Sequence, residues 1–434
     1  MSTLFEEPRA AMVGNVELSA VLRGRSFPIE RLDDILSAGL PWVPTNSCIS
    51  ASNTIPPDNP FGPMGETKLV AIPETRMLLP SRDDRPTMAL YLSEITHHDG
   101  AFWEVCARSQ LRRALDDMKA RYGLTMKIGF EQELYIDGLE DVHTPAYSLA
   151  GSRRVSGFAA EVQQILGTAN TRVDQFAAEY GEHQFEISHP VREALKGCDE
   201  VVLAREAIRD TARGHGAHAT FAPKPDVTQA GSGIHIHFSL WDESGPRTCH
   251  SGALTATSGA FAAGILKYIE AVMAFTTPSP NSFHRISESS WVGVFACLGI
   301  RNREAAIRLC PRGPKADGAH PGASLEYRLC DGASNPYLAL AALVRAGMMG
   351  LDEALDPPQS ADMDPAKMTA EVRESRGYRR VPHELQPCLD AAAPLAKEWF
   401  GELFWSAYDS VRRNEINDAE NAGQLYPAQL ARAI

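Results

Sequence analysis

Four short segments that alternate polar with apolar residues carry the five glutamates Glu131, Glu133, Glu179, Glu186 and Glu326 together with His235. Alternate side chains of a β-strand point to opposite faces, so each segment would gather polar groups on one face. The segments span residues 126–136, 179–188, 231–240 and 325–329, and their polar residues include Glu131, Glu133, Glu179, Glu186, His235, His237, Ser239, Glu326 and Arg328. Any one segment alone is ordinary, because half-exposed strands alternate in the same way.

Taken together, the four segments predict a metal centre. If the strands pair, the five glutamates and His235 line one shared surface, where bare carboxylates repel one another. Divalent cations relieve this repulsion. A shell of carboxylate oxygens with one imidazole favours Mg²⁺ or Mn²⁺ over zinc or copper.

A second cluster consists of arginines beside apolar residues. Arg303 and Arg308 lie in the run GIRNREAAIRL, and Arg285 ends the run NSFHR. Guanidinium groups offer a planar fork to phosphate or carboxylate, although surface salt bridges would explain this cluster equally well by itself. Metal ions with converging arginines are the groups that phosphoryl transfer requires, since that reaction depends on positioning and charge neutralisation.

The elements that must position these groups differ along the chain. In the first hundred or so residues, strand-like runs such as VELSAVL and TKLVAIP are separated by turn-rich stretches, which predicts a small sheet-rich domain. A helical period follows over 102–122. Further helical patterns recur near 201–213, 253–274, 336–354, 385–396 and 397–413, with the polar strands between them.

Composition excludes several classes of protein. The 434 residues carry a formal net charge of -13, which argues against a nucleic-acid binder because such binders neutralise phosphates with Lys and Arg. None of the eight cysteines forms a C-x-x-C pair, so we expect free thiols in a reducing compartment. The N-terminal run MSTLFEEPRA lacks the features of a signal peptide, and we expect a cytoplasmic protein without a membrane span.

The order of the motifs resembles the glutamine synthetase family over most of the chain. The matching stretches are GFEQELYI, EYGEHQFEIS, GSGIHIHFSL, NSFHR, RNREAAIRL and SLEYRLCDGASNPYLALAA. The resemblance implies an α+β fold with a small β-grasp N-terminal domain, residues 1–104. A catalytic domain, residues 105–434, would follow, with an antiparallel sheet lining the active site. It also implies a homo-oligomer, a dodecamer of two stacked hexameric rings with active sites between subunits.

The same resemblance implies a role for each candidate residue. One metal site would use Glu133, Glu179 and Glu186, and the other Glu131, His235 and Glu326, with two to three Mg²⁺ or Mn²⁺ ions per active site. The remaining matches are His237, Ser239 and Arg308 near ATP, Arg303 and Arg308 on the transferring phosphate, and Arg285, Arg328 and Gly231 on the glutamate substrate. Glutamate would attack ATP to give a γ-glutamyl phosphate, which an amine then attacks to give an amide.

Departures from the family pattern concern the amine. Counted from Asn281, Trp291 stands where glutamine synthetases carry a glutamate that binds ammonium, and PTNSCISASN lacks the aspartate of their N-terminal domain. We therefore expect an organic amine as acceptor, with Trp291 packing on its carbon skeleton or its cation. A cation–π contact contributes about 0.5–2 kcal/mol. The alternative is that Trp291 fills core space.

Smaller departures concern the nucleotide and one turn. Ser324 replaces an arginine near the nucleotide, for which Arg312 or Lys315 could substitute, and His183 and Ala230 replace glycine and asparagine.

Three other functions compete with amine ligation. An authentic glutamine synthetase would use ammonium held by other groups. A non-catalytic structural relative should have lost metal ligands or arginines, which this sequence retains. A donor acid other than glutamate would still need an α-amino dicarboxylate analogue to satisfy Arg285 and Arg328.

Overall fold

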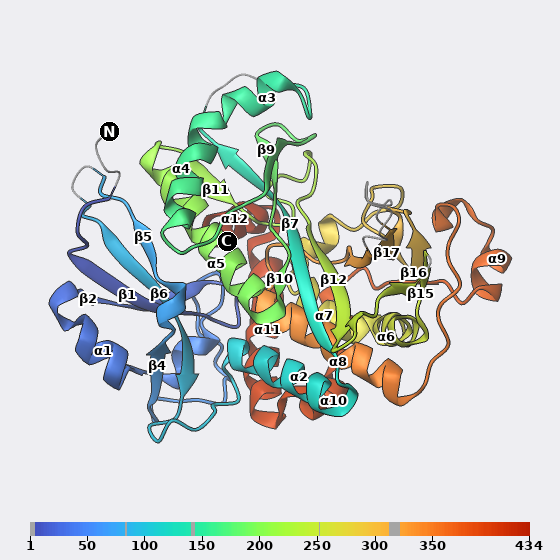
Figure 1. Cartoon of the computed structure of the whole chain (residues 1–434), viewed down its shortest axis with the longest axis horizontal. Coiled ribbons are helices and arrows are strands. Elements are labelled where there is room, and N and C mark those ends of the chain that lie inside the picture. The colour runs from blue at the N-terminus through green and yellow to red at the C-terminus, as the bar shows by residue number, and fades with distance from the viewer. Residues whose placement is uncertain (1–4, 83–84, 140–143, 251, 312–321) are drawn as a thin grey trace.

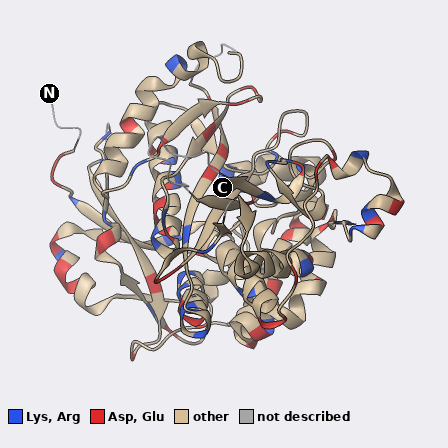
Figure 2. Ribbon diagram, turned by 45° about the vertical axis from the view of Figure 1, so that its right-hand side comes forward, with Lys and Arg blue, Asp and Glu red and all other residues tan. Residues whose placement is uncertain are grey.

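The computed structural model describes residues 5–82, 85–139, 144–250, 252–311 and 322–434. It has two parts, a small N-terminal sheet and a much larger mixed unit (Figure 1). The α+β arrangement expected from the sequence is therefore present. Acidic and basic residues are interspersed over both parts (Figure 2), so the net charge of -13 is spread over the molecule.

The N-terminal part is a twisted sheet in the strand order β2-β1-β6-β4-β3, with β5 pairing with β6. Its central strands β1 and β6 are parallel, as in a β-grasp fold, and the other pairs are antiparallel. The elements are β1 (Ala10–Val16), β2 (Leu22–Pro28), α1 (Leu32–Ala38), β3 (Leu40–Trp42), β4 (Thr67–Ala71), β5 (Met77–Leu79) and β6 (Met88–Thr96). The run TKLVAIP does form β4, whereas most of VELSAVL forms the turn between β1 and β2.

The larger part is built on a mixed sheet in the order β19-β16-β17-β18-β12-β7-β9-β8, to which β10, β11 and β13 add at the margins. Its strands are β7 (Thr125–Asp137), β8 (Gln175–Ala178), β9 (Gln184–Ser188), β10 (Arg192–Glu193), β11 (His218–Thr220), β12 (Ile234–Asp242), β13 (Gly245–Pro246), β16 (Phe295–Ile300), β17 (Ala305–Pro311), β18 (Ala323–Tyr327) and β19 (Arg379–Arg380). A separate ribbon pairs β14 (Cys249–His250) with β15 (Ala253–Leu254). The long strand β7 is central, because β9, β10, β11 and β12 all pair with it.

Helices pack on the sheet, and the chain ends in the helices α10, α11 and α12. They are α2 (Ala107–Tyr122), α3 (Leu149–Arg154), α4 (Ser156–Gly167), α5 (Ala194–Gly214), α6 (Ala256–Lys267), α7 (Ile269–Thr276), α8 (Pro336–Asp352), α9 (Ala370–Ser375), α10 (Leu385–Phe400), α11 (Glu402–Ala422) and α12 (Tyr426–Ala433). Helices α2 and α5 contact β7, and α6 contacts β16 and β17. Helix α9 projects at the edge of the molecule (Figure 1). In the described ranges no single helix is long and apolar enough to cross a membrane, although the bent pair α6–α7 passes on length and composition alone.

Two local departures from the sequence prediction affect the site or its supports. Residues 179–188 are not one strand but the end of a β8–β9 hairpin, with Glu179 just after β8 and His183 in the turn at φ 63°. Glycine is favoured at positive φ, which explains the family's preference for glycine there. The helical pattern over 253–274 divides into α6 and α7, which bend by 77° at Tyr268.

The two parts are joined by buried polar contacts. The Asn335 side chain donates from Nδ2 to the carbonyls of Val16 and Glu17, at 3.0 Å each. Arg412, buried in α11, donates to the Leu18 carbonyl. All eight cysteines are free, as expected.

Candidate active site

The register of the large sheet aligns the candidate metal ligands. The directly opposed pairs, in order across the sheet, are Glu326–His237, His235–Glu131 and Glu186–Glu133. Opposed residues of an antiparallel pair place their side chains together on one face. Four adjacent strands, β18, β12, β7 and β9, therefore deliver carboxylates and imidazoles to one surface.

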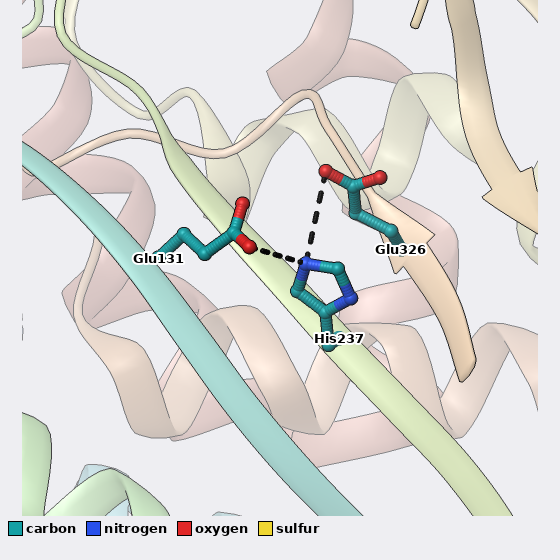
Figure 3. A group of neighbouring side chains, drawn as sticks. All are labelled: Glu131, His237 and Glu326. Carbon is teal, nitrogen blue, oxygen red and sulfur yellow. Dashed lines mark ion pairs between the residues drawn. The ribbon is translucent and has the colours of Figure 1, made fainter. Parts of the chain in front are cut away.

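Glu131 and Glu326 approach both imidazoles of β12. His235 Nδ1 lies 3.4 Å from Glu131 Oε2 and 3.6 Å from Glu326 Oε1. His237 Nε2 lies 3.3 Å from Glu131 Oε1 and 3.8 Å from Glu326 Oε1 (Figure 3). Glu326 is fully buried, so its charge depends on these neighbours and on nearby arginines.

The two imidazoles differ in protonation. Burial, with the charge of Arg328, lowers the pKa of His235 to about 4. Burial also opposes the charged form of His237, but contacts with Cys310 and Glu131 and the charge of Glu326 raise its pKa to about 10. Neutral imidazole is the metal-binding form. His235 is therefore prepared to bind a cation. His237 also offers a ligand atom, because one potential ligand atom each of His237, Glu131 and Glu326 lies within 4.8 Å of the others.

The other candidate glutamates, Glu133, Glu179 and Glu186, form an acidic group beside Glu131 and Glu326. Glu186 can share one ion with Glu131 and His235, because one potential ligand atom of each lies within 4.8 Å of the others. Burial, followed by the charges of neighbouring glutamates, raises the pKa of Glu186 to about 8. Burial raises the pKa of Glu133 to about 7, although its Oε2 accepts a 2.8 Å bond from the Gly233 amide.

Glu179 completes this acidic group from the β8–β9 turn. Burial raises its pKa, while hydrogen bonds from the Tyr147 hydroxyl and the Tyr180 amide oppose the rise. Buried carboxylates with raised pKa values are a donor set that a hard divalent cation would stabilise. The residues present thus fit Mg²⁺ or Mn²⁺.

Two arginines on β17 and just after β18 contact Glu326. Arg308 lies opposite Glu326 in the strand register and forms an ion pair with it. Arg328 also pairs with Glu326, and it donates from Nε to the Arg303 carbonyl at 3.1 Å and from Nη2 to the Trp291 carbonyl at 2.7 Å. One buried carboxylate therefore links the metal-ligand candidates to the arginines.

Most of these groups line a cavity of about 640 Å³, although His237 and Glu326 are absent from its described lining. Its lining includes Glu131, Glu133, Glu179, Glu186, His235, Gly231, Arg285, Arg303, Arg308, Arg328 and Trp291. Gly231 is required by packing, because a Cβ there would lie 2.4 Å from Cγ of Arg285. The sequence thus predicted a set of residues that the fold brings to one cavity.

Ser239 is not brought into the cavity. It follows His237 on the same face of β12, but its hydroxyl accepts a 2.9 Å bond from the Trp241 indole, and it is absent from the described lining. Ser324 lies 3.3 Å from His237 Nδ1. Arg312 and Lys315, the suggested substitutes near the nucleotide, lie outside the described residues.

Sequence reasoning missed four residues at this site. Tyr147 and Tyr180 line the cavity, Glu304 binds the Trp291 amide at 3.0 Å, and Cys310 lies 3.6 Å from Glu326 Oε2. Tyr180 and Glu304 could have been noticed, because each adjoins a candidate residue in a motif. Tyr147 had no such signal, since it lies far upstream of Glu179 in the chain and meets it only in three dimensions.

Comparison with known proteins gives the family. Residues 10–103 match the glutamine synthetase N-terminal domain, and residues 104–427 match the glutamine synthetase catalytic domain. The chain is 30% identical over 422 residues to a γ-glutamylpolyamine synthetase of Streptomyces coelicolor, covering 93% of this chain and 89% of that protein. It is 28% identical over 392 residues to a glutamine synthetase of Thermococcus kodakarensis, covering 88% and 83%.

Solved structures agree with the family assignment. A crystal structure of a glutamine synthase homologue superposes with a TM-score of 0.87 at 28% identity, covering 100% of both chains. The GmaS–ADP complex superposes with a TM-score of 0.78 at 23% identity, covering 95% and 94%, which shows a shared fold. The chain belongs to the glutamine synthetase family of ATP-dependent ligases.

Proposed function

We propose that this chain joins the γ-carboxylate of glutamate to an organic amine, with a γ-glutamyl phosphate as intermediate. The observation that carries the proposal is the combination of a complete set of candidate metal ligands and arginines with a tryptophan where an ammonium-binding glutamate is expected. Trp291 is 51% exposed and lines the cavity, which argues against a core-filling role.

The proposed roles of the acidic residues follow the family match. Glu133, Glu179 and Glu186 would hold one divalent ion, and Glu131, His235 and Glu326 another. The low pKa of His235 and the raised pKa of Glu186 support these assignments. Two to three bound Mg²⁺ or Mn²⁺ ions would neutralise phosphate charge and act as a template.

The proposed reaction has two steps, phosphoryl transfer and amide formation. An oxygen of the glutamate γ-carboxylate attacks the γ-phosphorus of ATP, the bond to the leaving ADP oxygen breaks, and the acyl phosphate forms. The amine nitrogen then attacks the acyl carbon, the carbon–oxygen bond to phosphate breaks, and phosphate and a proton are released. Arg303 and Arg308 would stabilise the transferring phosphate, with His237 near the nucleotide.

The glutamate substrate would lie beside Arg285 and Arg328. Arg285 and Arg328 line the cavity and would hold its α-carboxylate, with a backbone contact at Gly231 to its amino group. Ser239 has no contact that supports a direct role, because its hydroxyl is bound to Trp241.

The nature of the acceptor separates this proposal from its rivals. The Streptomyces relative is named a γ-glutamylpolyamine synthetase, which supports an organic amine, whereas the Thermococcus relative is named a glutamine synthetase, which favours ammonium. A non-catalytic scaffold is disfavoured because the candidate metal ligands and the candidate phosphate-binding residues Arg303 and Arg308 are all retained. We also propose that the protein is a cytoplasmic homo-oligomer with the domains 1–104 and 105–434.

The test is ATP-dependent phosphate release with glutamate and Mg²⁺, screened against ammonium and a panel of primary amines. We expect release with amines and little with ammonium. Strong release with ammonium alone would identify an ordinary glutamine synthetase, and silence with every acceptor would favour a scaffold or another donor acid.

The acceptor role of Trp291 is tested by Trp291→Glu with Trp291→Gln as the uncharged control. We expect Trp291→Glu to use ammonium better than Trp291→Gln does. Equal use of ammonium by the two variants would show that this position does not select the acceptor.

A further inference from the structure

Three half-exposed aromatic side chains stand together at the mouth of the cavity. Tyr147, Tyr180 and Trp291 are 57%, 60% and 51% exposed, and all three line the cavity. The ring centroids of Tyr147 and Tyr180 are 5.7 Å apart, and those of Tyr180 and Trp291 are 5.8 Å apart, both edge to face. We call these three residues the aromatic rim. Large apolar side chains that remain exposed beside a cavity mark a binding surface.

Two residues of the rim have a strained backbone. Tyr147 has φ 56° and Trp291 has φ 63°, in the left-handed region that bulky residues rarely adopt. Such strain is retained at functional sites where the surrounding structure enforces it. A core-filling role does not explain it here, because both side chains are more than half exposed.

Hydrogen bonds hold both strained residues in place. The Tyr147 amide donates to the Ala178 carbonyl at 2.9 Å. The Trp291 amide donates to Glu304 Oε1 at 3.0 Å, and its carbonyl accepts from Arg328 Nη2 at 2.7 Å. The two strained residues are therefore positioned before any ligand binds, which lowers the ordering cost of binding.

The rest of the lining offers little to an alkyl chain. Among the described lining residues, only Val292 and Ala230 have aliphatic side chains other than the stems of charged residues. Within one subunit, an apolar tail leaving the cavity would meet mainly charged groups and the three rings. Electron-rich ring faces attract cations, so the surface that remains is suited to a tail with positive charge.

Tyr147 is further adapted to a cation. Its hydroxyl donates a hydrogen bond to Glu179, and the Tyr180 amide contacts the other oxygen of that carboxylate at 3.3 Å. A phenol that donates to a carboxylate carries more electron density on its ring, which strengthens attraction for a cation above the face.

We propose that the aromatic rim binds the non-reacting end of the acceptor, and that it selects primary amines with a second ammonium group several bonds from the reacting nitrogen. This inference rests on the proposed function, because it concerns the acceptor of the same ligase. Ammonium and methylamine lack such a tail, so they would forgo the contact with the rim. The acceptor class is therefore that of diamines and longer polyamines.

The experiment compares acceptors of equal length that differ in the charge of the tail. KM is measured for 1,5-diaminopentane and pentylamine in the full-length protein with saturating ATP, Mg²⁺ and glutamate. We expect the KM for the diamine to be about 3- to 10-fold lower, as one or two cation–π contacts would give.

Tyr180 provides the matched variants, because its ring lies between the other two and its hydrogen bond to Glu179 comes from the backbone amide, which a side-chain substitution retains. Tyr180→Leu removes the ring, and we expect it to raise the KM for the diamine while the KM for pentylamine changes less. Tyr180→Phe retains the ring and should retain the preference. If Tyr180→Leu does not fold, as judged by thermal unfolding, Trp291→Leu and Trp291→Phe serve as the second pair.

The outcomes separate this inference from the proposed function. Ligase activity with equal KM values for the two acceptors, or a preference that survives Tyr180→Leu, overturns the role of the rim and leaves the amine ligase intact. Preference for pentylamine shows that the rim binds an apolar tail and equally overturns the inference. Absence of glutamate-dependent phosphate release with all acceptors refutes the proposed function itself.

Discussion

Binding of divalent cations should release protons from the acidic group, because two of its members retain protons in the metal-free protein. Their pKa values are about 8 for Glu186 and about 7 for Glu133, raised mainly by burial. At pH 7 these values leave about 0.9 and 0.5 protons on the two groups, together about 1.4. An ion that needs both carboxylates ionised must displace them.

The sign of the pH dependence follows from this count. Both pKa values are raised, so protons compete strongly with the ion below pH 7 and compete little only above about pH 9. Affinity for Mg²⁺ or Mn²⁺ should therefore rise with pH, by about 100-fold or more between pH 6 and pH 8. Carboxylates with ordinary pKa values are fully ionised at pH 6, so they would give almost no change in metal affinity between pH 6 and pH 8.

Isothermal titration calorimetry with Mn²⁺ measures both quantities. Titrations of the metal-free protein at pH 7, in two buffers of different ionisation enthalpy, give the number of protons released. Glu186→Gln should remove the larger share of the release. Glu17→Gln is the matched control, since burial also raises the pKa of Glu17 to about 7 but this residue lies in the N-terminal sheet region, outside the described lining of the cavity. Release below about 0.3 protons at pH 7 would refute the reasoning.

Three further predictions concern stability and catalysis. Buried Glu17 stays protonated in the folded state up to about pH 7, so its contribution to stability is lost as pH rises from its ordinary pKa of 4.5 to 7. Glu17→Gln should raise the free energy of unfolding by up to about 3 kcal/mol at pH 8 and little at pH 4, and equal shifts in thermal unfolding at both pH values would contradict this. Gly350→Ala should destabilise the fold by about 2 kcal/mol or more, because a Cβ there would lie 2.1 Å from the Ala260 carbonyl oxygen between α6 and α8. The control Gly157→Ala in α4 meets nothing within 4 Å and should be neutral or slightly stabilising in the same denaturant titration. Arg308→Ala should lower kcat by about 10²–10³ with a smaller effect on KM for glutamate, and an unchanged kcat would exclude a role in phosphoryl transfer.

Much of the sheet could be predicted because its signal is local. The alternation around Glu131 and His235 identified β7 and β12 correctly, since one face of each strand packs on the core. The pairing of these residues across the two strands then brought predicted ligands together. The helices at 194–214 and 336–352 were also recognised, with errors confined mainly to their ends.

The features that escaped prediction depend on tertiary contacts. The polar pattern runs through Glu179 without interruption, although the chain turns there between β8 and β9. The break at Tyr268 has no proline or glycine to signal it and arises where α6 and α7 pack in different directions. The aromatic rim unites three segments of the chain, so no spacing of Tyr147, Tyr180 and Trp291 could reveal it.

The Trp291 loop also bears on ammonium use. If another acid had replaced the missing glutamate, Glu304 would be one candidate, because its carboxylate reaches the amide of Trp291 itself. That bond engages Oε1 in holding a strained backbone, and burial raises the pKa of Glu304, which weakens it as a site for a small cation. Arg328 binds the carbonyl of the same residue and adds positive charge on its other side. The contacts that fix the tryptophan thus oppose ammonium at this position, while its half-exposed ring remains available to a larger amine.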